Sequence, residues 1–143
     1  MSIVRKTNLI TTLIITFFLA TLNLIKTSTF DIPILTSWNI TKKMEKYDLV
    51  LLQFTTSSCN VCLYLERTLY DLKSQATKIM IDYNKTIYIA KVNLENDEYL
   101  REKFSIYKFP ALQLINNQYN TQHSFPLETI EATVPKILSF IDA

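Results

Sequence analysis

The two cysteines of the chain lie three positions apart, where the sequence changes from a strand pattern to a helix pattern. Before them, the run DLVLLQFT over residues 48–55 is almost continuously apolar, which is typical of a strand buried on both faces of a sheet. After them, apolar residues recur at helical spacing from Asn60 to about Asp82. A buried strand followed by a long helix predicts an α/β domain with Cys59 and Cys62 at the junction.

Strand and helix patterns alternate along the rest of the chain beyond residue 30. We expect an edge strand over 31–35, a short helix over 38–46 and a strand over 86–93, then a helix over 97–104, a hairpin over 111–125 and a closing helix over 127–142. This order predicts one domain over 31–143, with a central mixed sheet of about four to five strands flanked by helices.

The sequence contains no glycine, which supplies about 7% of residues in an average protein. Chain reversals that need positive φ must therefore use Asn or Asp, the next most tolerant residues. We expect Asn116 and Asn117 to form the hairpin turn for this reason. The absence of glycine also excludes glycine-rich phosphate loops, so neither a dinucleotide fingerprint nor a P-loop can form.

Residues 1–30 have the pattern of a targeting segment. Arg5 and Lys6 precede an uncharged apolar stretch over 9–25, as in a secretory signal peptide or signal anchor. The stretch approaches the length of about 17–25 residues that crosses a bilayer, so we expect an N-terminal hydrophobic helix that is cleaved or anchors the chain in a membrane. With Arg5 and Lys6 on the cytosolic side, the domain lies in the lumen.

Two glycosylation sequons agree with a lumenal location. Asn39-Ile40-Thr41 and Asn84-Lys85-Thr86 both match the acceptor pattern N-x-[ST]. We therefore expect the domain to lie in the lumen of the endoplasmic reticulum or elsewhere in the secretory pathway, where disulfides form. The net charge of +2 and the lack of a basic stripe with interleaved aromatics indicate no nucleic-acid partner.

The cysteine spacing fits a redox pair. At a helix start, Cys59 meets unpaired N–H groups and the positive end of the helix dipole, which stabilise a thiolate. Cys62, one turn deeper, is placed to displace a partner from Cys59. Two structural buried cysteines are the plain alternative. A structural zinc site normally needs four ligands, and Cys59, Cys62 and His123 fall short of that number, so we expect no metal.

Two segments of the sequence resemble the thioredoxin superfamily and, within it, the domains of protein disulfide isomerases. The first, YDLVLLQFTTSSCNVCLYLE, is similar to the family's second strand and active-site helix. The second, IYIAKVNLENDEYLREKFSIYKFPALQLINNQ, is similar to its strand, helix, cis-proline strand and hairpin. The resemblance covers residues 34–141 and implies a thioredoxin-like fold. It also implies that Pro110 is cis and lies against the cysteine pair, and that Phe109, Pro110 and Ala111 bind an extended client strand.

Some positions depart from the family pattern. Gln53 stands where the family has a buried carboxylate that assists the second thiol, whereas Lys91, the usual neighbour of that carboxylate, is retained. The dipeptide between the cysteines contains no His. We expect Gln53 and Lys91 either to tune proton transfer at Cys62, or to be structural, with Gln53 hydrogen-bonded and Lys91 extending to solvent.

The resemblance implies a secretory-pathway thiol–disulfide oxidoreductase or isomerase that acts on cysteines of client polypeptides. Cys59 would be the nucleophile and Cys62 the resolving residue, with no cofactor beyond this redox-active disulfide and with an unidentified reoxidising or reducing partner. The alternative is a weakly catalytic or non-catalytic adaptor or holdase that binds client chains. Such a protein would be similar to the lumenal thioredoxin-like subunits of oligosaccharyltransferase.

Three other side chains carry secondary predictions. Trp38 is expected to anchor the first helix in the core, and His123 is expected on the surface of the hairpin. Tyr107 and Lys108 precede Phe109 and are expected to line the peptide groove, with simple packing as the alternative.

Overall fold

The computed structural model describes residues 11–17, 31–128 and 131–143. The chain divides into two units, Met1–Phe30 and Asp31–Ala143. In the first unit, residues 11–17 form a helix with exposed side chains, and no helix within the described ranges is both long and apolar enough to span a bilayer. The rest of the expected targeting segment, including Arg5 and Lys6, lies outside the described residues, so the signal peptide or anchor remains a prediction.

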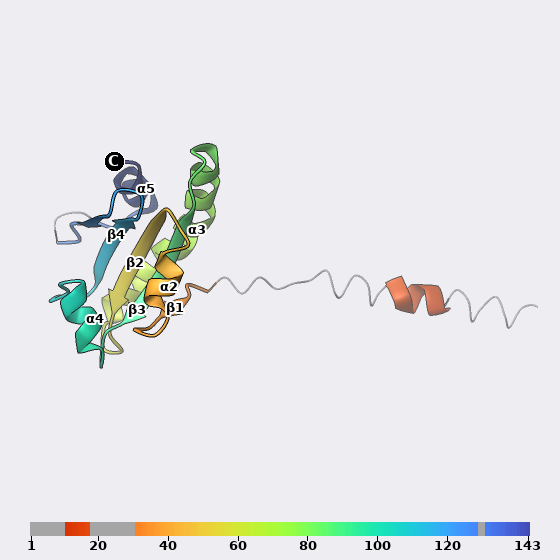
Figure 1. The fold of residues 1–143 in the computed structure, drawn as a ribbon. Helices are drawn as coiled ribbons and strands as arrows, with labels where there is room; N and C mark the ends of the chain where they lie inside the picture. Colours follow the sequence, from red (N-terminus) through yellow and green to blue (C-terminus); the bar gives the residue numbers. More distant parts are fainter. Residues whose placement is uncertain (1–10, 18–30, 129–130) are drawn as a thin grey trace, which may run out of the picture. The chain divides into compact units, whose positions relative to one another are not determined.

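The second unit contains, within the described residues, a five-stranded mixed sheet with the order β1-β3-β2-β4-β5 (Figure 1). Strands β1, β3 and β2 run parallel, β4 is antiparallel to β2, and β5 is antiparallel to β4. The predicted mixed sheet is therefore confirmed, with the apolar run at its centre. The strands are β1 (Ile34–Leu35), β2 (Leu49–Thr55), β3 (Ile87–Asn93), β4 (Ala111–Asn116) and β5 (Thr121–Ser124).

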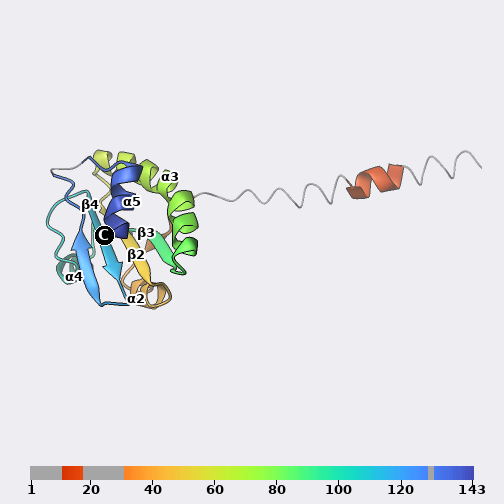
Figure 2. The ribbon, with the colours of Figure 1, turned by 90° about the horizontal axis from the view of Figure 1, so that it is seen from above.

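Helices cover both faces of this sheet. Figure 2 shows α3 and α5 on one side of the strands and α2 and α4 on the other. The predicted bounds of α3 are confirmed. They could be predicted because apolar residues recur at helical spacing over the whole segment. The helices are α2 (Ile40–Met44), α3 (Asn60–Asp82), α4 (Glu98–Lys103) and α5 (Val134–Asp142).

The closing helix is shorter than predicted. Residues 127–128 and 131–133 are not helical, and α5 begins at Val134. Pro135 lies in the first turn of α5, where a missing N–H leaves no helix hydrogen bond unmade. The proline therefore lies at the start of the helix.

Strand β2 supplies side chains to two separate cores. Leu49 and Leu51 pack with α3 and α5, whereas the alternate residues Val50, Leu52 and Phe54 pack with α2 and α4. All five are at most 3% exposed, which explains why the strand reads as a continuous apolar run. Gln53 is the polar exception within this run, and it is fully buried on the α3 face.

Trp38 does not anchor the core, contrary to prediction, because its side chain is 94% exposed. The first helix begins two residues later, at Ile40, and Ile40 fills the core position in its place. His123 is exposed on β5, as predicted.

Three non-glycine residues adopt positive φ in the described part of the chain: Asn84 (53°), Ser105 (55°) and Asn120 (52°). The prediction that Asn takes over the role of glycine is confirmed at two of them. The predicted hairpin turn at Asn116–Asn117 is wrong, because β4 continues through Asn116 and the reversal falls on residues 117–120. The Asn116 side chain instead accepts hydrogen bonds from the backbone of Gln118 and Tyr119.

Ser105 ends α4 in a geometry that normally selects glycine. The Ile106 N–H donates to the Arg101 carbonyl at 2.9 Å, and the Ser105 N–H donates to the Glu102 carbonyl at 3.0 Å. This pair of bonds is a Schellman motif, in which the residue after the helix cap adopts the left-handed conformation. Ser105 therefore carries a Cβ where the backbone favours none.

We expect Ser105→Gly to raise the free energy of unfolding by about 0.5–1 kcal/mol. The left-handed conformation costs a residue with a Cβ about 1–2 kcal/mol, partly offset by the greater unfolded-state entropy of Gly. Urea denaturation measures the change. The matched control is Ser74→Gly on the exposed face of α3, expected to lower stability by about 0.5 kcal/mol. A loss of stability in Ser105→Gly would contradict the argument.

Asp48 joins the starts of β2 and β3. Its carboxylate accepts hydrogen bonds from the Thr86 N–H and hydroxyl, each at 2.7 Å, and its own N–H donates to the Thr86 hydroxyl at 3.0 Å. The hydroxyl bond from Thr86 is the largest cause that lowers the pKa of Asp48 below 3.8, followed by the N–H bond. Because the folded state lowers this pKa, the carboxylate stabilises the fold above about pH 3.8 and loses that contribution as the pH falls further.

Asp48→Asn should therefore destabilise the protein at pH 7, since a neutral amide is a weaker acceptor for the two Thr86 donors. The difference in melting temperature from the unmodified protein should shrink as the pH falls below about 3.8. Thermal melts over a pH series test this, with Asp71→Asn on the exposed face of α3 as the control. A difference that stays constant into strong acid would show that the carboxylate charge is irrelevant.

Candidate active site

The loop after β2 places the two cysteines at the start of α3. The Cys59 N–H donates to the Thr56 carbonyl at 3.2 Å, and the Cys62 N–H donates to the Cys59 carbonyl at 3.1 Å. Cys59 therefore directly precedes the helix, and Cys62 lies within its first turn. The predicted position at the strand-to-helix junction is confirmed.

Cys59 and Cys62 form a disulfide, with an S–S distance of 2.07 Å and a Cα–Cα distance of 5.4 Å. The two residues differ in accessibility: Cys59 is partly exposed, whereas Cys62 is only 3% exposed. An external thiol or disulfide therefore reaches Cys59 first, and Cys62 is shielded. The arrangement suits stepwise thiol–disulfide exchange, whereas two merely structural cysteines would need no such asymmetry.

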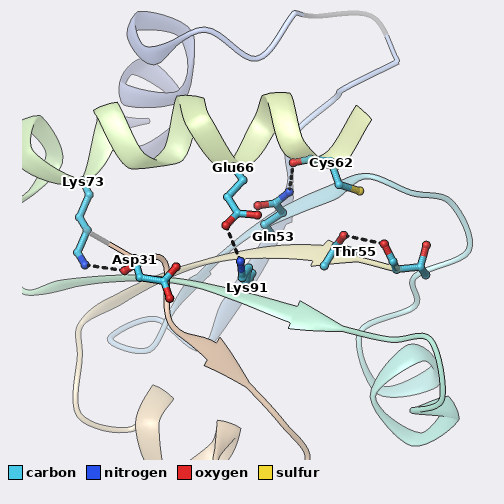
Figure 3. Close-up of polar contacts among 8 residues, drawn as sticks. Asp31, Gln53, Thr55, Cys62, Glu66, Lys73 and Lys91 are labelled. Atoms are coloured by element: carbon cyan, nitrogen blue, oxygen red, sulfur yellow. Dashed lines mark hydrogen bonds and ion pairs between the residues drawn. The ribbon is translucent and has the colours of Figure 1, made fainter. Parts of the chain in front are cut away.

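Gln53 lies beneath the first turn of α3. Its amide nitrogen donates a hydrogen bond of 2.8 Å to the Cys62 carbonyl (Figure 3). Its amide oxygen is buried and has no hydrogen-bond partner among the described residues. The expected structural hydrogen bond is confirmed, and it joins Gln53 to the backbone of Cys62. An amide does not titrate near neutral pH, so Gln53 cannot accept the Cys62 proton.

Lys91 lies beside Gln53 in the neighbouring strand β3, with the two residues paired in register. Its ammonium group forms an ion pair with Glu66 of α3, and both side chains are half-buried (Figure 3). The prediction that Lys91 extends freely to solvent is therefore wrong. Glu66 was not foreseen as a site residue. Its spacing of four residues after Cys62 was visible in the sequence, but its pairing with β3 was not.

A cavity of about 250 Å³ opens beside the disulfide. Cys59, Cys62, Glu66 and Lys91 all contribute to its lining, together with polar residues of the loop after β2. At its rim, the Ser57 hydroxyl donates a hydrogen bond to the Glu95 carboxylate. The structure thus places Lys91 and both cysteines around one cavity, and the tuning role of Lys91 stays a prediction.

The Pro110 segment lies at the same end of the sheet as the disulfide, because Ala111 pairs with Phe54 near the end of β2. The Phe109–Pro110 peptide bond is cis, as the family resemblance implied. A groove of about 610 Å³ separates Phe109 and Pro110 from Val61 and Tyr64 in the first turns of α3. Pro110 shares this groove with the first turns of α3, whereas the two cysteines line the separate cavity of about 250 Å³. That Pro110 lies against the cysteine pair stays a prediction.

The residues before Pro110 have distinct surroundings. Tyr107 is exposed, and Lys108 forms an ion pair with Glu128 at 2.6 Å across the groove. The hydrogen bond between them lowers the pKa of Glu128 and raises that of Lys108. The Arg101 guanidinium lies over the Phe109 ring, 5.6 Å from its centroid. Lys108 and Phe109 therefore line the groove between α3 and Pro110, whereas Tyr107 lines a second hollow of about 420 Å³ on the other side of Pro110.

The two sequons differ in their local structure. Asn84 is exposed in the turn after α3, whereas the Asn39 side-chain oxygen accepts a hydrogen bond of 2.9 Å from the Thr36 N–H. Glycosylation at either position remains a prediction, and the exposed Asn84 is the more accessible acceptor. His123 lies on β5, separated from β2 by β4, and is not part of the site.

A family model described as Thioredoxin matches residues 31–138. A comparison with the sequences of curated proteins finds no match. The family match covers both cysteines, the Gln53 and Lys91 strands and the Pro110 segment.

Solved structures share the fold at low sequence identity. The zinc-bound form of human ERp44 has a TM-score of 0.66 and 17% identity, over 78% of this chain and 29% of that one. The first thioredoxin domain of mouse protein disulfide-isomerase A4 has a TM-score of 0.61 and 18% identity, over 76% and 71% of the two chains. The first two thioredoxin domains of Saccharomyces cerevisiae Eps1p give 0.63 and 21%, over 80% and 40%. The chain thus spans less than a third of ERp44, and the likeness confirms the expected fold.

Proposed function

The chain belongs to the thioredoxin family, and from this membership we propose that it is a secretory-pathway thiol–disulfide oxidoreductase acting on cysteines of client polypeptides. One observation carries the proposal: a partly exposed sulfur directly before α3 is bonded to a buried sulfur one turn inside it. That asymmetry separates the roles of the two cysteines. Cys59 is the nucleophile and Cys62 the resolving residue.

In the reducing direction, the Cys59 thiolate attacks one sulfur of a client disulfide. The client S–S bond breaks, a Cys59–client mixed disulfide forms, and the first client sulfur leaves as a thiolate. Cys62 then loses its proton and attacks the Cys59 sulfur, which closes the Cys59–Cys62 disulfide and releases the second client sulfur. The client gains two electrons and two protons, and the domain loses them. Oxidation of a client is the same sequence in reverse.

The groove between α3 and Pro110 is the proposed client site. Val61 and Tyr64 offer exposed apolar surface on one side, and the backbone around Phe109, Pro110 and Ala111 forms the other. An extended client strand laid along this backbone would hold its cysteine near Cys59 by strand addition.

The secretory location and the class of substrate rest on separate arguments. The apolar stretch over 9–25 and the sequons at Asn39 and Asn84 support a lumenal domain, where disulfides persist. The likeness to a domain of a protein named disulfide-isomerase supports client polypeptides as the substrate class.

A second candidate function is a thioredoxin-like adaptor that captures client thiols without rapid turnover. Gln53 favours it, because the buried amide beneath Cys62 cannot remove a proton from the resolving thiol. Slow resolution would prolong the mixed disulfide and convert an enzyme into a holdase.

An insulin-reduction assay on the protein tests the enzymatic proposal. We expect turnover above the dithiothreitol background that is lost in both Cys59→Ser and Cys62→Ala. Cys62→Ala should still form mixed disulfides with oxidised client chains, whose disulfides the Cys59 thiolate attacks, whereas Cys59→Ser should not, since only Cys59 is partly exposed.

A matched surface control is Ser74→Ala, which leaves the site untouched and should retain full activity. No turnover by the unmodified protein, combined with client trapping by Cys62→Ala, would reject the enzyme and support the adaptor. Trapping through Cys62 and not through Cys59 would reject both.

A further inference from the structure

The proposed exchange mechanism assigns no role to Glu66, whose carboxylate lines the cavity beside the disulfide. Gln53 cannot transfer a proton, and its amide nitrogen is already bound to the Cys62 carbonyl. Closing the disulfide nevertheless requires Cys62, which is almost completely buried, to lose a proton. Some other group must accept that proton if exchange is to be fast at neutral pH.

We propose that Glu66, held in place by Lys91, accepts the proton of the Cys62 thiol when the Cys59–client mixed disulfide is resolved. The proposal rests on the proposed thiol–disulfide exchange and adds a proton-transfer residue to it. The proposed proton acceptor is thus a carboxylate on helix α3, whereas strand β2 contributes only the amide of Gln53.

The helix geometry brings Glu66 to the same side as Cys62. The two residues are four apart in α3, so their side chains lie on one face, one turn apart. Figure 3 shows Glu66 extending from α3 toward the strands, where its carboxylate meets the Lys91 ammonium group. The ion pair fixes the carboxylate over β3, next to the Gln53 strand.

The cavity beside the disulfide supplies the path. Cys59, Cys62, Glu66 and Lys91 all line its volume of about 250 Å³. That is room for several water molecules, each of which occupies about 30 Å³ in the liquid. A water chain can therefore carry a proton from the Cys62 sulfur to the Glu66 carboxylate.

The charges around this path single out Glu66. Among the described residues that line the cavity, the titratable groups are the two cysteines, Glu66 and Lys91. Glu95 lies at the rim, exposed and bound to the Ser57 hydroxyl. From β2 the site receives Gln53, which is neutral, and from β3 it receives Lys91, whose positive charge is paired with Glu66.

The proposed step balances as follows. The Cys62 proton passes through water to a Glu66 oxygen while the Cys62 sulfur bonds to the Cys59 sulfur. The Cys59–client S–S bond breaks, and the client sulfur leaves with the electron pair. Glu66 then returns the proton through the cavity to the leaving client thiolate or to solvent.

Rapid mixing of the reduced protein with oxidised glutathione, followed by acid quenching and mass spectrometry, separates the two steps. Formation of the Cys59–glutathione adduct reports on Cys59, and its conversion to the closed disulfide reports on Cys62. We expect Glu66→Gln to slow the second step at pH 7 by at least about tenfold, leaving the first step unchanged. The adduct should then accumulate.

The pH profile distinguishes proton transfer from a structural role. The effect of Glu66→Gln should shrink as the pH rises, because hydroxide then removes the thiol proton without the carboxylate. Glu66→Asp should restore part of the rate, and Glu95→Gln, which removes the rim carboxylate, should behave like the unmodified protein. Glu66→Met gives the same test should Glu66→Gln fail to fold.

Two outcomes overturn the proposal. One is an unchanged second step in a folded Glu66 variant, and the other is a slowing that is equal at all pH values. If instead the unmodified protein forms neither the adduct nor the closed disulfide, the proposed oxidoreductase function fails, which is a separate result.

Discussion

Burial of β2 on both faces fixes the position of the disulfide. Its alternate side chains pack against helices on opposite sides of the sheet, so the strand cannot shift without disrupting both cores. The strand ends at Thr55, and the short loop that follows starts α3 directly after Cys59. Cys59 is thereby partly exposed at the helix start while Cys62 is buried within the first turn, and the proposed chemistry of the site follows from that difference.

Polar groups beneath the disulfide modify this chemistry without changing the fold. A buried amide at Gln53 satisfies the α3 backbone but removes a titratable group from the strand. The Glu66–Lys91 pair brings a carboxylate and an ammonium group back to the same cavity from α3 and β3. The site therefore has the cysteine pair of an oxidoreductase, but the proposed proton acceptor is Glu66 on α3, because the β2 position holds Gln53.

The sequence predicted the strand and the helix whose hydrophobic patterns extend over many residues. The continuous apolar run of β2 and the helical period of α3 gave their positions because both signals are strong over many residues. Tertiary contacts decided the rest. Ile40, and not Trp38, packs in the core. Strand β4 includes Asn116, which was expected in the turn. Ser105 adopts a left-handed conformation that no sequence motif predicts. Likewise, Glu66 and Lys91 are 25 residues apart in the sequence, so their ion pair cannot be predicted from either segment alone.

The difference in accessibility between the two sulfurs is the central claim, and alkylation of the reduced protein measures it directly. A short exposure to iodoacetamide at neutral pH, followed by mass spectrometry of each cysteine peptide, gives the two rates. The account predicts that Cys59 reacts many times faster than Cys62, because only Cys59 is partly exposed and lies at the helix start. Equal rates, or faster modification of Cys62, would contradict it.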